Sequence, residues 1–284
     1  MKKLAVLLLV AVTLFGCSKK SPTATTTVQA KFIVAEFNLY RWWGSSPNFY
    51  EWVEVFSDPA PNLTQSSAQM KFGATTYQVT RDKSQWPGGV QLMDTFHFPY
   101  PGIACSLFVN TNVGNSRSGG VSAPGSYTIN SPGAYDTLPW GDVALSWSQA
   151  QYATWYDLYL NYSAYNGTNH LGDADTQFIV TGTSVQIPQA FFRKYGSSTY
   201  VDAYFSLNAH AGAAPGAGAV GNLTGDIKGV FYSTFEDSGS SRWFYMGSPK
   251  LALGSVTPHP QISHEKRRQF IIRAFGLPVK AEAD

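Results

Sequence analysis

Two aspartates in a polar segment have the residue type and spacing of metal ligands. Asp173 and Asp175 are separated by one residue and follow the Asn- and Gly-containing segment 166–169. Carboxylate oxygens at this spacing suit Ca²⁺, a hard cation that takes several oxygen ligands. The segment departs from an EF-hand loop, because no glycine and glutamate follow at the positions that this loop requires. We expect either Ca²⁺ at these two residues or ordinary turn carboxylates, and otherwise no cofactor.

Aromatic residues gather in three short segments that could bind a ligand by stacking. The candidate ligand-binding residues are Trp42, Trp43, Tyr50, Trp86 and Tyr100. In an extended strand, adjacent side chains point to opposite faces, so Trp42 and Trp43 cannot both enter one core. Exposed rings beside Asn and Arg can stack on sugars or anchor a protein partner. The alternative is that these rings fill the protein core and a domain interface.

The sequence lacks short motifs that mark common hydrolases. No G-x-S-x-G segment is present, and His264-Glu265 is followed by Lys-Arg-Arg, so H-E-x-x-H is absent as well. The five histidines are scattered, and with two cysteines in the sequence a structural zinc site is not expected. We therefore predict that the protein is not an enzyme. Paired carboxylates drawn from distant strands, as in glycoside hydrolases, remain open.

The first 16 residues predict an export signal. Lys2 and Lys3 precede an apolar run over residues 4–15. As a helix this run would rise about 18 Å, which is too short for the ~30 Å hydrocarbon core of a bilayer. The run therefore indicates a signal peptide, residues 1–16, rather than a membrane span.

The end of this run, Leu14-Phe15-Gly16-Cys17, resembles the lipobox of bacterial lipoproteins. The resemblance implies cleavage before Cys17 and acylation of its thiol, and two or three acyl chains anchor a protein stably to a membrane. An ordinary secretory signal with a coincidental cysteine is the alternative. Ser rather than Asp follows the cysteine, which by the same resemblance implies an extracytoplasmic protein anchored in the outer membrane, on its periplasmic or surface face. Residues 17–28 are polar and indicate a flexible tether.

Charge and cysteine content limit the possible partners. Residues 31–250 carry 11 Lys and Arg against 15 Asp and Glu, a net charge of −4. Nucleic-acid-binding proteins need a basic face, so no nucleic-acid partner is expected. Cys105 is the only cysteine besides Cys17, so no intramolecular disulfide is expected, and Cys105 is predicted to be a buried apolar residue.

Short β-branched and aromatic runs dominate the remaining sequence. Charged residues make up 13% of the sequence against an average of about 25%, which argues against long helices. Turn residues recur roughly every 8–14 positions, a spacing typical of antiparallel sandwiches. We therefore predict an all-β fold of two antiparallel β-sandwich domains with a short C-terminal helix. Residues 29–130 resemble an immunoglobulin-like domain, and we place the domain boundary at residues 130–133.

Residues 131–254 resemble a fibronectin type III domain. The resemblance rests on the alternating run that ends in Trp147 and on the V-x-G-T-S segment at 180–184. The strands B, C, F and G that it implies are residues 143–148, 155–160, 200–209 and 227–235. The long Ala- and Gly-rich segment 209–221 departs from the family pattern, and residues 242–246 predict an extra strand.

The last 30 residues, 255–284, predict a linker followed by a short basic helix or tail. Ser263 can cap a helix over residues 264–275, which Gly276 ends. The apolar side chains of this helix cluster on one face, and four of its residues are Lys or Arg. One interpretation is a helix that docks on a membrane surface or a partner. The other is a helix packed on the second sandwich, or a frayed tail.

These patterns predict a lipid-anchored cell-envelope protein that acts as a non-catalytic binding, adhesion or structural module. Its expected partners are the membrane, through the lipid on Cys17, and a glycan or envelope protein. A secreted carbohydrate-active or other hydrolytic enzyme with an accessory type III domain is one alternative. A subunit of an envelope assembly that docks through its C-terminal helix is another.

Overall fold

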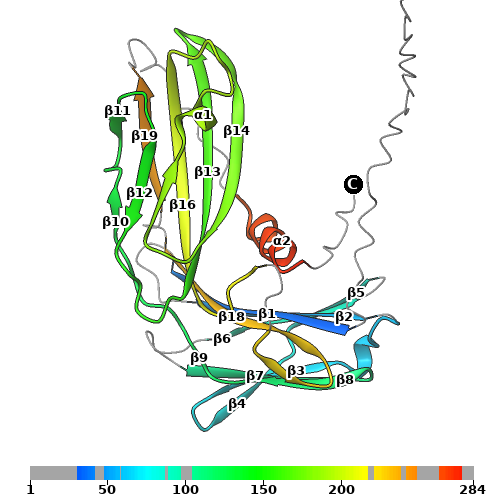
Figure 1. Ribbon diagram of the computed structural model, residues 1–284. Coiled ribbons are helices and arrows are strands. Elements are labelled where there is room, and N and C mark those ends of the chain that lie inside the picture. Colours follow the sequence, from blue (N-terminus) through cyan, green and yellow to red (C-terminus); the bar gives the residue numbers. More distant parts are fainter. Residues whose placement is uncertain are drawn as a thin grey trace, which may run out of the picture.

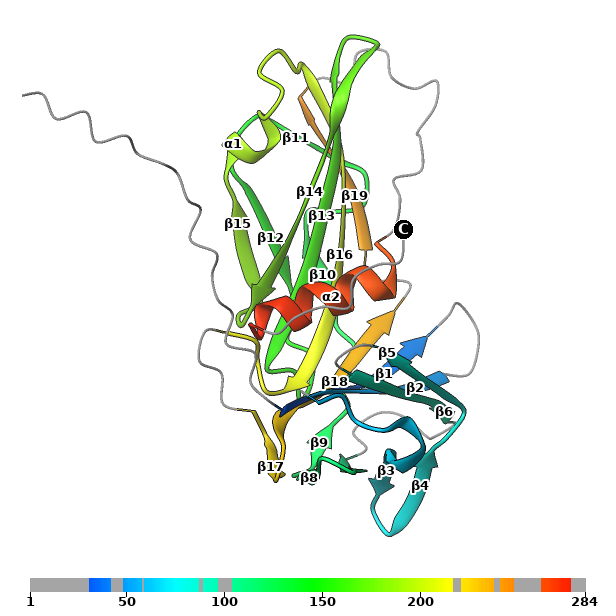
Figure 2. The ribbon, with the colours of Figure 1, turned by 90° about the vertical axis from the view of Figure 1, so that its right-hand side faces the viewer.

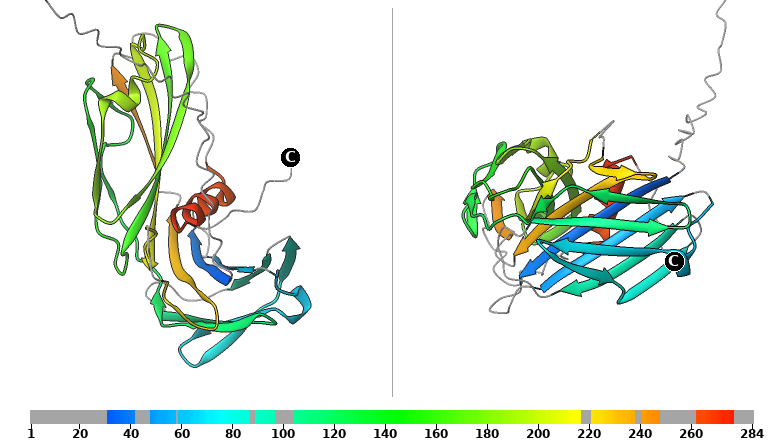
Figure 3. Two further views of the ribbon diagram at one scale, coloured as in Figure 1. Left: turned by 45° about the vertical axis from the view of Figure 1, so that its right-hand side comes forward. Right: turned by 90° about the horizontal axis from the view of Figure 1, so that it is seen from below.

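The computed structural model describes residues 31–41, 48–57, 59–86, 89–96, 104–216, 221–237, 241–247 and 262–276. Within these residues the protein is mostly β-strand. Two packed groups of strands meet at an angle, and a helix lies in the concave junction between them, which we call the elbow (Figure 1; Figure 3). The predicted all-β architecture with a short C-terminal helix is confirmed at this level.

The first group of strands forms two layers. It contains β1 (Lys31–Arg41), β2 (Asn48–Ser57), the 3-10 helix η1 (Leu63–Gln65), β3 (Ser67–Phe72), β4 (Thr75–Val79), β5 (Asp82–Trp86), β6 (Gly89–Phe96), β7 (Ala104–Thr111), β8 (Gly114–Ser118) and β9 (Val121–Ser122). Two later strands, β17 (Leu223–Gly225) and β18 (Lys228–Asp237), complete it. One layer has the order β18-β1-β2-β6-β5 and the other β4-β3-β7-β8, and β17 joins them by pairing with both β18 and β8 (Figure 1).

Alternation along the strands decides which side chains of this group enter the space between the layers. On β1, Ile33 and Ala35 belong to the main hydrophobic core, whereas Val34 belongs to a second cluster at the elbow. Because successive side chains of a strand point to opposite faces, Glu36 shares the elbow face with Val34. The layer β18-β1-β2-β6-β5 therefore has an apolar inner face, and its other face, toward the elbow, carries both polar and apolar side chains.

The second group consists of a small sheet that faces a longer one (Figure 2). Its elements are β10 (Ile129–Ser131), β11 (Asp136–Leu138), β12 (Val143–Trp147), β13 (Trp155–Asn166), β14 (Asn169–Val180), β15 (Ser184–Ile187), the short helix α1 (Gln189–Phe192), β16 (Tyr200–Gly212) and β19 (Ser241–Gly247). The small sheet has the order β10-β12-β15, and pairing along the longer one gives β14-β13-β16-β19. The strands expected at 143–148, 155–160 and 200–209 are present as β12, β13 and β16.

Residues 227–235, expected as the last strand of the second sandwich, lie mainly in the first group instead. β18 runs parallel to β1 over ten register pairs, and only four of its residues pair with β16. β19 pairs with β16 at this edge instead. It includes residues 242–246, which were expected to form an extra strand. β18 follows the predicted domain boundary at residues 130–133 in the sequence, yet it is hydrogen-bonded to β1, which precedes that boundary.

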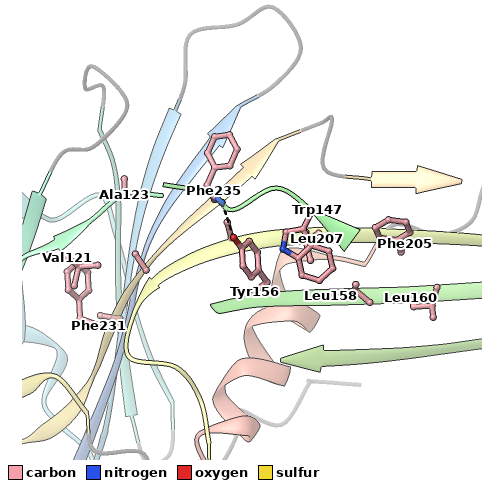
Figure 4. Close-up of a cluster of buried hydrophobic side chains, with 14 of the residues drawn as sticks. Val121, Ala123, Trp147, Tyr156, Leu158, Leu160, Phe205, Leu207, Phe231 and Phe235 are labelled. Carbon is pink, nitrogen blue, oxygen red and sulfur yellow. Dashed lines mark hydrogen bonds between the residues drawn. The ribbon is translucent and has the colours of Figure 1, made fainter. Parts of the chain in front are cut away.

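The two groups share a continuous hydrophobic core. Tyr156 and Leu158 of β13 and Leu207 of β16 lie in the second group, and the same buried cluster extends to Phe231 and Phe235 of β18 (Figure 4). Cys105 of β7 also belongs to this cluster and is 1% exposed, as predicted for a small apolar residue. The elbow is thus a bend within one core rather than a flexible joint between two.

Helix α2 (His264–Ala274) fills the elbow (Figure 2). Ser263 caps it, because its hydroxyl accepts a hydrogen bond from the Lys266 backbone N–H at 3.2 Å. Ile271 and Ile272 are 2% and 3% exposed and belong to the cluster of buried apolar side chains at the elbow. The apolar face of the helix is therefore covered by the chain itself. None of the described helices is long and apolar enough to cross a membrane.

Candidate functional site

A chain of hydrogen bonds between four buried polar side chains lies under α2. His210 joins Asp157 through Nε2 and Oδ2 at 2.7 Å, and joins Thr234 through Nδ1 and Oγ1 at 2.9 Å. The Thr234 hydroxyl donates to Glu36 Oε1 at 2.6 Å. We call these four residues, with the two arginines of α2 that contact them, the elbow cluster.

Four strands from both groups position the cluster. In the β16–β18 register His210 stands opposite Thr234, and in the β13–β16 register it stands opposite Trp155. Asp157 is two residues beyond Trp155 on β13, so it shares that face. Glu36 comes from β1, which runs beside β18. The cluster exists only because β18 joins the two groups of strands.

Two consecutive arginines of α2 close the cluster from above. Arg267 donates to Asp157 Oδ1 and to the Ser206 hydroxyl. Arg268 lies 3.7 Å from Glu36 Oε2, and its guanidinium sits over the Trp52 ring at 4.0 Å from the centroid. Cation–π contacts of this kind gain strength when they are shielded from water.

Burial of the cluster is nearly complete. His210 and Asp157 are 0% exposed, Thr234 is 1% exposed and Glu36 is 7% exposed. The Trp155 ring stacks on the His210 imidazole with 3.8 Å between centroids. Water is therefore excluded from the hydrogen-bond chain.

The electrostatic environment keeps Asp157 ionised. Burial on its own would raise the pKa of this carboxyl, but the Arg267 charge and the hydrogen bond from His210 outweigh burial, so the pKa lies below its ordinary value. A buried carboxylate that accepts bonds from both a guanidinium and an imidazole is stabilised as an anion. Asp157 is thus the fixed negative end of the chain.

The order Asp–His–Thr is that of a catalytic triad, but its hydroxyl is not placed for attack. Thr234 already donates its hydrogen to Glu36 and is 1% exposed. A nucleophile needs a free approach for the substrate and a base to take its proton. In this arrangement the polar groups hold β1, β13, β16, β18 and α2 together.

The two aspartates of the candidate calcium site lie on β14. Asp173 Oδ1 accepts a hydrogen bond from the Ser163 hydroxyl at 2.6 Å and lies 3.0 Å from His170 Nε2. Asp175 lies on the same face, two residues further along the strand, and is exposed. In the described part of the chain, no three His, Cys, Asp or Glu residues stand close enough to hold a metal ion.

The candidate aromatic residues are placed only in part. Cys17, Trp42, Trp43 and Tyr100 lie outside the described residues, and for Tyr50 and Trp86 the structure describes the backbone alone. Tyr50 stands opposite Thr95 and the neighbouring Phe49 opposite Phe96, where β6 ends. The start of β2 and the end of β6 therefore lie at the same end of the layer. Trp86 pairs with Gly89, which stands opposite Phe56 at the other end.

Sequence reasoning did not find the elbow cluster. Glu36 and Thr234 are 198 positions apart, and none of the cluster residues belongs to a short motif. The available signal was a charged residue inside an otherwise apolar strand, namely Glu36 in FIVAEF and Asp157 in WYDLYL. Charged residues are rarely buried without a partner, so each of them indicated a buried pair.

Comparisons with known proteins give no family. No protein-family model matches the sequence, and no curated protein matches it. Among solved structures, a DUF4785 family protein from Legionella pneumophila is 11% identical, with a TM-score of 0.23 over 62% of this chain and 52% of that chain. A marsupial T cell receptor is 9% identical, with a TM-score of 0.19 over 73% of this chain and 74% of that chain. This chain spans about half of the Legionella protein, and likenesses at these scores carry no functional argument.

Proposed function

We propose that this protein is a lipid-anchored component of the cell envelope, held in the outer membrane through Cys17, that binds a glycan or an envelope protein without transforming it. The lipobox-like segment before Cys17 supports the anchor and the location. The aromatic segments supply the binding surface, since flat rings stack on sugar faces and anchor protein partners.

The register of one layer carries the proposal. Because Phe49 stands opposite Phe96, β2, which follows Trp42 and Trp43 in the sequence, begins beside the end of β6, which precedes Tyr100. The strands that flank two of the three aromatic segments in the sequence thus meet at one end of the layer, and Tyr50 lies on β2 there. The segment with Trp86 starts at the opposite end. One end of the layer is therefore favoured as the binding surface over the other.

The elbow cluster supports a non-catalytic role. It gathers Asp157, His210 and Thr234, three residue types that hydrolases use, yet each is buried and engaged in hydrogen bonds between strands. Their hydrogen bonds join the two groups of strands. A rigid body with a tether at one terminus suits presentation of a binding surface.

The finer fold assignment is part of the same proposal: an immunoglobulin-like first domain and a fibronectin type III-like second one. The pairing β10-β12-β15 and β14-β13-β16-β19 supports the second assignment, because it corresponds to sheets A-B-E and C′-C-F-G of that family. The segment that forms β17 and β18 pairs with strands of the first group and so departs from the family pattern.

Substitution of aromatic residues at the two ends of the layer tests the binding role. Trp42→Ala, Trp43→Ala and Tyr100→Ala are compared with Trp86→Ala, the matched control, for co-sedimentation with purified peptidoglycan and a panel of insoluble polysaccharides. We expect the first three variants to lose at least tenfold in affinity and Trp86→Ala to bind like the parent.

Two results would contradict this assignment. Equal loss in all four variants would show that the register does not define the surface, and turnover of any glycan would show an enzyme. The anchor is tested separately, by metabolic labelling with palmitate, where Cys17→Ser should remove the label and release the protein from the membrane fraction. An unlabelled parent protein would refute the anchor.

A further inference from the structure

The outer face of the layer β4-β3-β7-β8 carries one exposed aromatic ring among polar side chains. Phe108 of β7 is 40% exposed, whereas its neighbours Leu107 and Val109 are 1% and 0% exposed and belong to the core. Buried and exposed positions alternate in the same way along β3 and β8, so each strand has an inner and an outer face. No other described element lies over the outer face (Figure 1; Figure 3). The Phe108 ring is therefore open to a partner.

The strand register places Phe108 at the centre of a row that crosses five strands. Gln69 of β3 stands on one side of Phe108 and Arg117 of β8 on the other. The row continues to Gln78 of β4 beyond Gln69, and to Thr224 of β17 beyond Arg117. Neighbouring strands lie about 4.8 Å apart, so the row is roughly 19 Å long. A row of this length can contact several units of an extended chain.

This face is cationic in a protein that is otherwise acidic. Lys71 and Arg117 are exposed, and the other outward side chains of β3, β4, β7, β8 and β17 are uncharged. In the described part of the chain neither cation forms an ion pair with a carboxylate. Asp226 lies at the margin, where its carboxylate accepts a hydrogen bond from the Asn115 backbone N–H at 3.1 Å. Since residues 31–250 carry a net charge of −4, this face favours an anionic partner.

The chemistry of these side chains matches an acidic glycan. The Phe108 ring can stack on the apolar face of a sugar. The amides of Gln69 and Gln78 both donate and accept hydrogen bonds, as sugar hydroxyls do. The Arg117 guanidinium can bind a carboxylate through two parallel hydrogen bonds.

Other classes of partner fit this face less well. A face that docks on a membrane needs a larger apolar area or a cluster of several cations. An interface with a protein usually has a core of several apolar anchors, whereas Phe108 is the one large apolar side chain at the outward positions of these strands.

We propose that the outer face of β4-β3-β7-β8-β17, centred on Phe108, binds a linear polysaccharide that carries carboxylate groups. This inference rests on the binding role proposed above and names an acidic glycan as a ligand, but it uses a surface on the other layer from β2 and β6. Phe108 supplies the stacking contact, and Lys71 and Arg117 pair with the carboxylates.

Binding of the full chain, in a non-ionic detergent, to polygalacturonate and alginate tests the proposal. Both are linear chains of uronic acids, and methyl-esterified polygalacturonate is the matched neutral glycan. We expect Phe108→Ala and Arg117→Gln each to weaken binding by about tenfold or more. The parent should bind the ester about tenfold more weakly than the acid, and salt should weaken binding of the acid because it screens the ion pairs.

Tyr152→Ala and Lys266→Gln are the controls, because they remove an exposed ring and an exposed cation outside this face. Both should bind the acidic glycans like the parent. Trp42→Ala should also do so, which separates a failure of this face from a failure of the aromatic segments. An unchanged midpoint of denaturant unfolding verifies that each variant is folded.

Three results would overturn the proposal. They are a parent protein that binds neither acidic glycan, equal binding of the acid and its methyl ester, and full affinity in both Phe108→Ala and Arg117→Gln. If the parent instead binds phosphatidylglycerol vesicles but no glycan, and Phe108→Ala loses that binding, the face belongs to a membrane contact and the proposal is wrong.

Discussion

Glu51 shows that a single buried carboxyl can work against the stability of this fold. It is 0% exposed, lies on the inner face of β2 beside Val53, and neither carboxyl oxygen has a hydrogen-bond partner among the described residues. Burial, with a further contribution from the Glu36 charge, raises the pKa of Glu51 well above its ordinary value. The folded state thus favours the neutral form of this side chain.

Glu51→Gln is expected to stabilise the protein at neutral pH. A carboxyl whose pKa is raised on folding costs stability as pH climbs from the unfolded value, here 4.5, toward the folded one. The advantage of the variant should grow by about 1.4 kcal/mol per pH unit over that window and vanish below pH 4. Urea denaturation at pH 4, 6 and 7.5 measures it.

The matched control for this substitution is Asp82→Asn, because the Asp82 side chain is 71% exposed. It should change the free energy of unfolding by less than about 0.5 kcal/mol at every pH. A Glu51→Gln variant that is no more stable than the parent at pH 7.5 would show that Glu51 finds a partner in solution.

At the scale of elements, α2 works as a clamp because two neighbouring arginines point to different groups of strands. Arg267 contacts Asp157 of β13, whereas Arg268 contacts Glu36 of β1 and the Trp52 ring of β2. Ile271 and Ile272 follow one turn later and fill the apolar part of the elbow. The helix therefore binds both groups with polar and apolar contacts at once.

Arg267→Ala should destabilise the protein by about 3–5 kcal/mol, because it leaves the Asp157 carboxylate buried with one charged partner fewer. The readout is the midpoint of denaturant unfolding together with hydrogen exchange of the α2 amides, which should lose protection first. Arg273→Ala on the exposed face of the same helix is the control and should stay within about 0.5 kcal/mol of the parent. Equal effects of the two substitutions would refute the clamp.

For the whole molecule, the path of the chain makes the two groups of strands interdependent. β18 comes from the last third of the sequence and pairs with β1, the first described strand. The main hydrophobic core includes Val53 of β2 as well as Leu158 of β13. Because one core spans both groups of strands, we expect the two groups to unfold together.

Fragments cut at the sequence-derived boundary should therefore fail to fold. Residues 31–130 lack β18 and would expose the edge of β1, and residues 131–254 would expose the apolar face of β18. We expect both fragments to give poorly dispersed ¹H–¹⁵N spectra, while the full chain unfolds in a single calorimetric transition. A well-dispersed spectrum from either fragment would show that the boundary marks an independent domain.

The sequence determined the local properties of this protein. Alternation and turn spacing were enough to predict an all-β fold, because period-2 patterning is a property of neighbouring residues. The strands at 143–148, 155–160 and 200–209 were placed by the resemblance to a fibronectin type III domain. The capped helix at 264–275 was predicted to within one residue from Ser263 and Gly276, since caps act over a few positions. The burial of Cys105 followed from its apolar neighbours.

Only the tertiary structure decided which strand pairs with which and where the buried charges meet. The pattern of residues 227–235 fits a buried strand in either group, so the sequence could not assign it to β1 rather than to β16. The elbow cluster joins residues from four strands and a helix that are far apart in the sequence. Hydrogen bonds and ion pairs depend on distances of about 3 Å in space, which residue order does not encode until the whole chain has packed.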